Sequence, residues 1–449
     1  MAAEERVAWL LAEQVRLEAA IKDKDAVIAR LKPAAAAAAR PSRFVGASQA
    51  KSALVPSASG SRPRRIPAAL DMPRDIAENA ELDKAVADTL PKNYNFEIKK
   101  SLWRIRRCGA KRVALQLPEG LLMFACPLSD LFERFANVEC LVMSDVTYGA
   151  CCVDDFGARA LGCQLLIHYG HSCLVPVDVT KGGEQGMETM YVFVDIHIDA
   201  EHLCDCVELS FPEGHRLVLM GTIQFVGALY AVQERLRKRY TLLIPQAKPL
   251  SGGEVLGCTS PSLAAGEHDA LVFVADGRFH LESAMIANPT LKAFRYDPYS
   301  RVLTEESYDT AHLARVRGAM VERGKSAVKW GVVQGTLGRQ GNPKIVQRVV
   351  DMLQGAGCEV MLLLLSEITP GKLALMDASV DCWVQIACPR LSTDWGEAFA
   401  KPLLTPYEAF CAKGGATWMP GGVHPQDYYA KATGPWGNYH AAAAASSSS

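Results

Sequence analysis

The sequence predicts an α/β fold of three similar parallel-sheet domains around a central site, with an N-terminal helical extension. A strand that ends near a glycine and leads into a helix occurs three times, at domain-sized intervals. Strands such as MLLLL are almost continuously apolar, which is typical of a parallel sheet with both faces covered. The 449 residues are 49% hydrophobic, which is enough for two or three separate cores.

The N-terminal extension is expected to be helical over residues 1–32. Apolar residues recur there at heptad spacing between Val7 and Leu31, which predicts a helix with a coiled-coil seam. Residues 33–90 are expected to be a linker and lead-in, because their alanine tract and their Ser-, Pro- and Arg-rich stretch lack periodicity. At the other end, a run of alanines and serines predicts a disordered tail over residues 433–449.

Each predicted domain begins with the repeated strand, which reads VALQLPEG, LVLMGT or VKWGVVQGT. A helix and two further strands follow each copy, and such helices supply the right-handed crossovers of a parallel sheet. Ligands of such sheets bind beyond the carboxyl ends of the strands, so we expect the functional residues there. The three domains are expected to span residues 91–205, 206–310 and 311–432.

Composition excludes several classes of function. The formal net charge of -1 gives no excess of Lys and Arg for binding nucleic acid. No apolar run approaches the roughly 20 residues that cross a bilayer. The first residues include Glu4 and Glu5 and lack the hydrophobic region of a signal peptide, so we do not expect export. We therefore expect a cytoplasmic protein that binds neither membrane nor nucleic acid directly.

The chain has fourteen cysteines, which in a reducing cytosol argue against a disulfide framework. Most lie in or beside apolar segments, where a thiol packs as a small hydrophobic group. Three are expected in loops at the carboxyl ends of strands, one in each domain: Cys151, Cys258 and Cys388. Cys388 follows the third strand of its copy, whereas the other two follow the second strand.

One thiolate from each of three domains can hold an iron–sulfur cluster at their junction. Three thiolates leave one iron of a [4Fe–4S] cluster open for a substrate. The spacing of the three cysteines matches no local metal motif, so on spacing alone the alternative is three loop thiols without a role.

Long, distinctive stretches follow one another through the predicted domains, among them NYNFEIKKSLWRIRR, DVTYGACCVDD, LGCTSP, DGRFHLESAMIANP, GTLGRQGNPKI and ACPRLSTDWG. These stretches are similar to subunit 1 of the 2-(3-amino-3-carboxypropyl)histidine synthase family, which acts in diphthamide biosynthesis. The resemblance runs from about Pro91 to Tyr407 and does not include the heptad segment. It implies a central iron–sulfur site in the predicted fold.

The resemblance implies that Cys151, Cys258 and Cys388 hold one [4Fe–4S] cluster. Cys152 is a possible replacement for Cys151, but the family places its ligand directly after Gly-Ala. The implied reaction transfers the 3-amino-3-carboxypropyl group of S-adenosylmethionine to C2 of a histidine of translation elongation factor 2. It is a radical transferase reaction, and methylthioadenosine is released.

The same resemblance implies three protein partners. The first is a homologous second subunit, with which the chain forms a heterodimer. The others are elongation factor 2 as the protein substrate and a small electron-donor protein.

Other polar residues at strand ends are weaker predictions for contacts with the substrate. Arginine matches a carboxylate bidentately, but a structural salt bridge is an equally good interpretation. A histidine at a strand end is more often structural, and the glycine-rich QGTLGRQGNP segment lacks the ending of a P-loop. The residues predicted to bind substrate are His171, Asp276, Arg278, Gln334, Gly335 and Arg390.

Two other functions remain open at this point. An enzyme similar to quinolinate synthase also brings three cysteines from three similar domains to an open-iron cluster. A non-catalytic scaffold would use the heptad arm for a partner and the thiols for zinc, which prefers four tetrahedral ligands.

Overall fold

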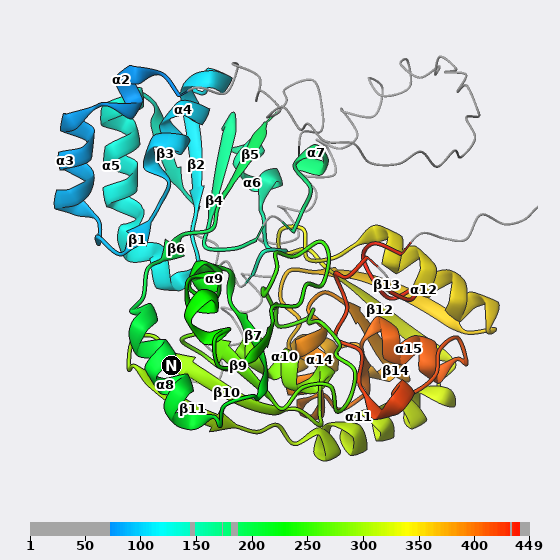
Figure 1. Cartoon of the computed structure of the whole chain (residues 1–449). Helices are drawn as coiled ribbons and strands as arrows, with labels where there is room; N and C mark the ends of the chain where they lie inside the picture. The colour runs from blue at the N-terminus through cyan, green and yellow to red at the C-terminus, as the bar shows by residue number, and fades with distance from the viewer. Residues whose placement is uncertain (1–71, 144–148, 173, 181–186, 432, 441–449) are drawn as a thin grey trace, which may run out of the picture. The chain divides into compact units, whose positions relative to one another are not determined.

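The computed structural model describes residues 72–143, 149–172, 174–180, 187–431 and 433–440 (Figure 1). The predicted heptad helix and the linker as far as residue 71 lie outside the described residues. Within the described part, no helix combines the length and the apolar character needed to cross a membrane.

Domain 1 is a four-stranded parallel sheet in the order β3-β2-β4-β5. Helices α2 to α5 cover one face, while α6 and α7 lie on the other. Residues 72–90 were expected to be lead-in, but Ile76 and Leu82 pack into this core, so they belong to the domain. The elements are α2 (Arg74–Ala77), α3 (Ala80–Thr89), α4 (Ile98–Cys108), β2 (Arg112–Gln116), η2 (Glu119–Phe124), α5 (Ala125–Ala136), β3 (Glu139–Val142), α6 (Asp155–Ala160), β4 (Leu165–Tyr169), α7 (Val177–Thr180) and β5 (Glu188–Val192).

Domain 2 has the order β11-β10-β9-β7-β8, in which only the pair β10 and β11 is antiparallel. Leu203 and Val207 of α8 pack under this sheet, so the expected boundary at residue 205 lies inside a helix of domain 2. The short strands β1 (Tyr94–Asn95) and β6 (Asp195–Ile196) pair where domain 1 ends. The other elements are α8 (Ala200–Ser210), β7 (Arg216–Gly221), η3 (Ile223–Phe225), α9 (Val226–Leu236), β8 (Thr241–Leu243), β9 (Ala270–Val274), α10 (Phe279–Ala287), β10 (Lys292–Asp297) and β11 (Val302–Glu306).

Domain 3 is again parallel throughout, in the order β13-β12-β14-β15. Helices α11, α12 and α15 pack on one face, and the short helices after β13 pack on the other. The elements are α11 (Thr310–Lys325), β12 (Lys329–Gly335), α12 (Pro343–Gly355), β13 (Glu359–Leu365), α13 (Pro370–Ala374), η4 (Asp377–Ser379), β14 (Cys382–Ile386), α14 (Pro389–Trp395), η5 (Gly396–Ala398), β15 (Leu403–Leu404), α15 (Pro406–Ala412) and η6 (Pro420–Gly422).

The three sheets share one strand order, since the first strand of each copy lies between the second and the third. This confirms the prediction of three similar α/β domains. The interpretation of MLLLL was wrong, however, because β13 is an edge strand in which Leu362 and Leu364 are 52% and 62% exposed. Only the alternate residues, such as Leu363, pack against the core.

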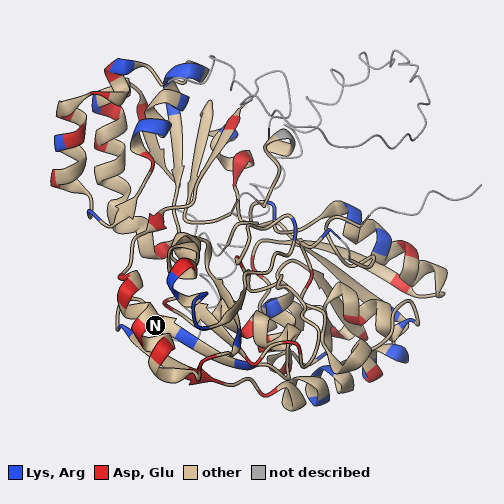
Figure 2. Ribbon diagram, in the orientation of Figure 1, with Lys and Arg blue, Asp and Glu red and all other residues tan. Residues whose placement is uncertain are grey.

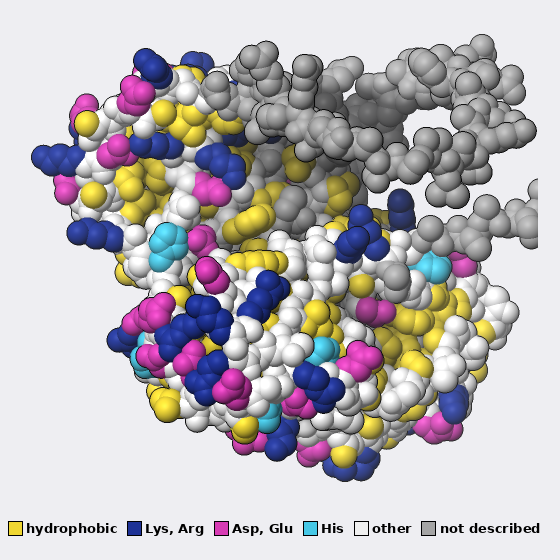
Figure 3. All heavy atoms as spheres, in the orientation of Figure 1, with side chains coloured by type: hydrophobic (Ala, Val, Ile, Leu, Met, Phe, Trp, Pro, Cys, Tyr) yellow, Lys and Arg dark blue, Asp and Glu magenta, His cyan; other side chains and the backbone are white. Residues whose placement is uncertain are grey.

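The outer surface carries charges of both signs. Figure 2 shows Lys or Arg together with Asp or Glu on helices such as α5 and α12, and Figure 3 shows apolar side chains between them on the same face. This mixed distribution agrees with the formal net charge of -1.

The segment 433–440, which was expected to be disordered, is held by hydrogen bonds. The guanidinium of Arg348 donates to the carbonyl of Gly437 over 2.9 Å, and the hydroxyl of Tyr439 donates to the carbonyl of Leu174 over 2.9 Å. The prediction is therefore wrong for these residues, because their partners lie in distant parts of the chain. Residues 441–449 lie outside the described part.

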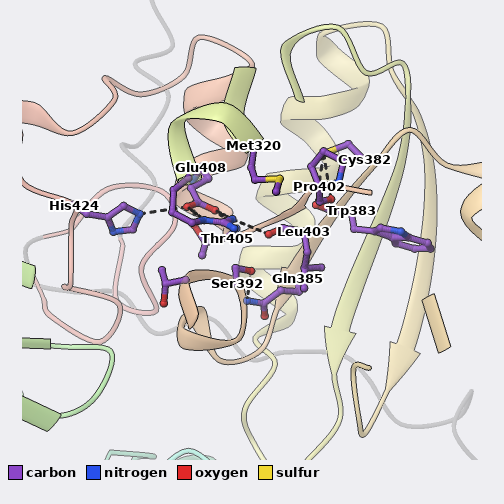
Figure 4. A network of polar contacts seen from close by, with 12 residues as sticks. Met320, Cys382, Trp383, Gln385, Ser392, Pro402, Leu403, Thr405, Glu408 and His424 are labelled. Atoms are coloured by element: carbon purple, nitrogen blue, oxygen red, sulfur yellow. Dashed lines mark hydrogen bonds and ion pairs between the residues drawn. The ribbon is translucent and has the colours of Figure 1, made fainter. Parts of the chain in front are cut away.

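A buried ion pair stabilises domain 3 (Figure 4). The guanidinium of Arg317 donates to both carboxylate oxygens of Glu408, over 2.8 and 2.6 Å, and neither side chain is exposed. Nε2 of His424 lies 3.4 Å from the same carboxylate. Burial alone raises the pKa of Glu408, but Arg317 and His424 outweigh it and hold this pKa at about 2.

We expect Glu408→Gln to destabilise the protein strongly at pH 7, because it leaves the Arg317 charge buried without a counter-ion, at a cost of about 3–5 kcal/mol. The folded pKa is lower than that of an unfolded glutamate. The stabilisation is therefore complete above about pH 4.5 and is lost as the pH falls towards about 2. Urea unfolding between pH 7 and pH 2 should show a larger loss of stability in the wild type than in the variant, in which only the other carboxylates titrate.

Glu201→Gln is the control, because Glu201 forms an ion pair while its side chain remains 80% exposed. Exposed pairs contribute about 0–1 kcal/mol. Equal losses in the two variants would contradict the importance of the buried pair.

Candidate functional site

The three predicted cysteines come together where the domains meet. Cys151 lies between β3 and α6, Cys258 in a tight turn between β8 and β9, and Cys388 directly after β14. The three thiols are close enough to interact electrostatically: Cys258 and Cys388 help to raise the pKa of Cys151, and Cys388 helps to raise the pKa of Cys258. One cysteine from each domain therefore contributes to a single site.

The three thiols have raised pKa values. A hydrogen bond with Cys152 and then burial raise the pKa of Cys151, and burial followed by the charge of Cys388 raises that of Cys258 to about 12. Burial also raises the pKa of Cys388, although the backbone N–H groups of Arg390 and Leu391 oppose the effect. Thiolates gathered in such a place require positive charge, which a metal cluster supplies.

The chemistry of these donors fits a cluster better than a single ion. Among the described residues, no group of three or more His, Cys, Asp and Glu side chains is arranged to hold one metal ion. Zinc, for example, requires each thiolate sulfur within about 2.3 Å of the ion. A cluster of several iron atoms is wider and can join thiolates that are further apart.

Arg339 of domain 3 fixes the loop of Cys151. Its backbone N–H donates to the carbonyl of Cys151 over 3.0 Å, and its guanidinium makes two 2.7 Å hydrogen bonds to the buried carboxylate of Asp155. The guanidinium also lies 4.0 Å from the ring centroid of Phe156. The glycine-rich QGTLGRQGNP segment thus contains the residue that joins two domains.

The loop of Cys258 is fixed on two sides. Leu256 and Thr259 pair through backbone hydrogen bonds of 2.9 and 3.2 Å, so Gly257 and Cys258 form the turn of a small hairpin. Glu254 precedes this hairpin and accepts a hydrogen bond from the hydroxyl of Ser172 in domain 1. Domains 1 and 2 are therefore joined beside the second cysteine.

Arg390 joins domains 2 and 3 beside Cys388. Its guanidinium donates to Asp394 on its own helix, to the carbonyl of Phe279 over 2.7 Å, and to Glu282 over 2.5 Å. Its side chain is only 4% exposed. The structural salt bridge is the interpretation of Arg390 that these contacts support.

The other predicted substrate contacts are not all gathered at the cysteines. Arg278 is paired with Glu306 over 2.6 Å, and its side chain is 47% exposed. Asp276 is exposed. Gln334 is half-buried within β12, and Gly335 ends that strand at a point where a Cβ would lie only 2.7 Å from Ala387.

His171 lies in a group of histidines that the sequence alone did not reveal. Its ring centroid is 5.4 Å from that of His168, and the charge of His171 influences His280 of domain 2. Burial lowers the pKa of His171 and of His280 to about 4, so both rings are neutral at pH 7. Nδ1 of His171 and Nε2 of His168 are buried and, among the described residues, have no hydrogen-bond partner.

The sequence also gave no reason to select Asp155, Tyr428 or Tyr429. Asp155 stands in the motif DVTYGACCVDD, where an acidic residue after two cysteines carries no signal of its own. Tyr428 and Tyr429 stand in HPQDYYA, and adjacent aromatic residues are typical of an ordinary core.

The fold and the site together define the class of this protein: it consists of three α/β domains that share one strand order, and each domain places a cysteine at their common junction. A family model described as "Putative diphthamide synthesis protein" matches residues 117–422. The chain belongs to the diphthamide synthesis protein family, within the group formed by subunit 1 of 2-(3-amino-3-carboxypropyl)histidine synthase.

Two relatives of that name illustrate the similarity. The chain is 54% identical over 391 residues to the protein of Gallus gallus, covering 87% of this chain and 93% of the relative. It is 53% identical over 366 residues to the protein of Homo sapiens, covering 81% and 82%.

The fold is also similar to a crystal structure described as Dph2 from Pyrococcus horikoshii with 4Fe-4S cluster. The TM-score is 0.59 at 27% sequence identity, and the match covers 72% of this chain and 92% of that one.

We expect Gly338→Ala to separate the loop of Arg339 from the loop of Cys151. Gly338 has a φ of +54°, and a Cβ there would lie 2.5 Å from the carbonyl carbon of Cys152. Overpacking of this kind costs about 1–3 kcal/mol, in addition to about 1–2 kcal/mol for a side chain in left-handed backbone. Urea unfolding of the two proteins measures the sum.

Gly357→Ala provides the matched control. Gly357 has a φ of +77°, but no atom lies within 4 Å of the added Cβ, so only the backbone cost applies. If both variants lost the same stability, the close approach of the two loops would not matter.

Proposed function

We propose that this chain is a subunit of the enzyme that catalyses the first step of diphthamide biosynthesis. It transfers the 3-amino-3-carboxypropyl group of S-adenosylmethionine to C2 of a histidine of translation elongation factor 2 and releases methylthioadenosine. The observation that carries the proposal is the meeting of Cys151, Cys258 and Cys388 at the domain junction. The names of the relatives and the cluster of the similar crystal structure agree with it.

In this proposal Cys151, Cys258 and Cys388 would hold a [4Fe–4S] cluster, and three protein ligands would leave one of its four irons available to the substrate. When bound, the cluster supplies the electron that cleaves the bond between the sulfur and Cγ of S-adenosylmethionine, giving a 3-amino-3-carboxypropyl radical. The chain provides the ligands at fixed positions, because each cysteine belongs to a separate, well-packed domain.

The chain also orients the substrate. His171 and His280 are neutral, and a neutral imidazole can donate to a carboxylate or accept from an ammonium group. Which bond of a sulfonium breaks depends on how it is held, so orientation decides the product. In this proposal Arg390 acts mainly by positioning domain 3 against domain 2, because its guanidinium is already paired with Glu282. Arg278 is paired with Glu306 inside domain 2 and has no direct part in binding the substrate.

The proposal includes protein partners. The relatives are named as subunit 1, which implies an enzyme of more than one subunit. We propose a heterodimer with a homologous second subunit, elongation factor 2 as the substrate, and a small electron-donor protein.

We expect Cys151→Ala, Cys258→Ala and Cys388→Ala each to lose most of the bound iron and sulfide, because each removes one of three ligands. Anaerobic reconstitution followed by iron and sulfide determination and visible spectroscopy measures the loss. Cys163→Ala is the control, since this thiol is buried in the core of domain 1. Full loading of all three ligand variants would end the assignment.

We expect transfer to require a reduced cluster. With S-adenosylmethionine, elongation factor 2 and dithionite, the products should be methylthioadenosine and a modified histidine, with little 5′-deoxyadenosine. Mass spectrometry of the factor and chromatography of the nucleosides measure them. A nucleophilic transferase gives the same products without an electron, so undiminished transfer by the oxidised protein would refute the radical mechanism.

A further inference from the structure

The C-terminal strap, which we define as residues 424–431, runs along the hairpin of Cys258. The backbone N–H of Ser260 donates to the carbonyl of Gln426 over 2.7 Å, and that of Tyr428 donates to the carbonyl of Cys258 over 3.1 Å. Thr259 and Asp427 form an antiparallel bridge between these two hydrogen bonds. The strap therefore has a fixed register relative to a proposed cluster ligand.

This register places two tyrosines beside the three thiols. Tyr428 and Tyr429 are 5% and 6% exposed, and their rings pack edge to face with centroids 5.3 Å apart. The backbone N–H of Tyr429 donates to the hydroxyl of Thr259 over 2.8 Å. Its phenol lies beside the thiol of Cys151, which belongs to domain 1.

The hydroxyl of Tyr428 is buried and has no hydrogen-bond partner among the described residues. This phenol lies close enough to Cys151, Cys258 and Cys388 to interact with all three electrostatically. A buried donor without an acceptor is destabilising. Phenylalanine would fill the same space without that cost, so packing alone does not explain a tyrosine here.

We propose that the hydroxyls of Tyr428 and Tyr429 are hydrogen-bond donors to the sulfur atoms of the three-cysteine site, and that they raise its reduction potential. This inference rests on the function proposed above. Reduction adds negative charge to the cluster and its thiolates, and a donor to sulfur stabilises that charge. The two tyrosines are thus positioning residues that tune the electron transfer.

The test uses the full chain, reconstituted anaerobically, in the wild type and in the variants Tyr428→Phe and Tyr429→Phe. Iron and sulfide per chain report loading, and a redox titration followed by electron paramagnetic resonance reports the midpoint potential. We expect full loading and a more negative potential. A ten-fold smaller ratio of reduced to oxidised cluster at a fixed potential corresponds to a shift of about 59 mV for one electron.

Tyr240→Phe is the matched control. Tyr240 is 4% exposed and its hydroxyl donates to the carbonyl of Phe211 over 2.9 Å, in the core of domain 2. This variant loses a buried hydroxyl in the same way, but its potential should equal that of the wild type.

Two further results complete the test. In iron-free protein, Tyr428→Phe should melt at the same temperature as the wild type or higher, because it removes an unpaired donor. If a phenylalanine variant does not load iron, 3-fluorotyrosine at position 428 decides: it keeps the ring and is a stronger donor, so the potential should become more positive.

Fully loaded phenylalanine variants with the wild-type potential, or no positive shift with 3-fluorotyrosine, would overturn the role of the tyrosines. A wild-type chain that binds no iron would instead overturn the proposed function, so the two failures are distinguishable.

Discussion

The hydrogen-bonded ion pair between Arg339 and Asp155 is the contact on which the geometry of the site most depends. Asp155 is completely buried in domain 1, and its shortest ion-pair contact comes from domain 3, in addition to a longer contact of 3.4 Å with Arg159 of its own helix. A buried carboxylate is costly without well-placed partners, which favours the arrangement of the two loops in which Arg339 reaches it. Because the backbone N–H of Arg339 also binds the carbonyl of Cys151, the contact between the domains and the position of the first thiol are determined together.

Two further polar contacts between domains lie beside the other two cysteines. Glu254 binds Ser172 close to the hairpin of Cys258, and Arg390 binds Glu282 next to Cys388. This arrangement has a cost in stability, because buried polar atoms remain without partners near the thiols. Departures from good packing and hydrogen bonding of this kind are expected where a protein functions.

Much of the fold was predictable from the sequence, because strand and helix patterns are local. The prediction of three strand–helix copies that form similar α/β domains was correct. The domain boundary at residue 205 was wrong because nothing in the pattern of α8 shows which of two neighbouring sheets it covers. The tail prediction failed over 433–440 because Tyr439 finds its partner at Leu174, far away in the sequence.

The sequence by itself determined which elements form and that Cys151, Cys258 and Cys388 follow strands, since both depend on neighbouring residues. Only the tertiary structure decided what the polar side chains near them bind. The sequence around Cys388 and Arg390 would be the same whether Arg390 bound a substrate carboxylate or, as in the structure, Glu282 of another domain. The strap tyrosines gave no signal for the same reason. A side chain that acts across a domain junction is defined by its partner's position, and sequence spacing contains no information about that position.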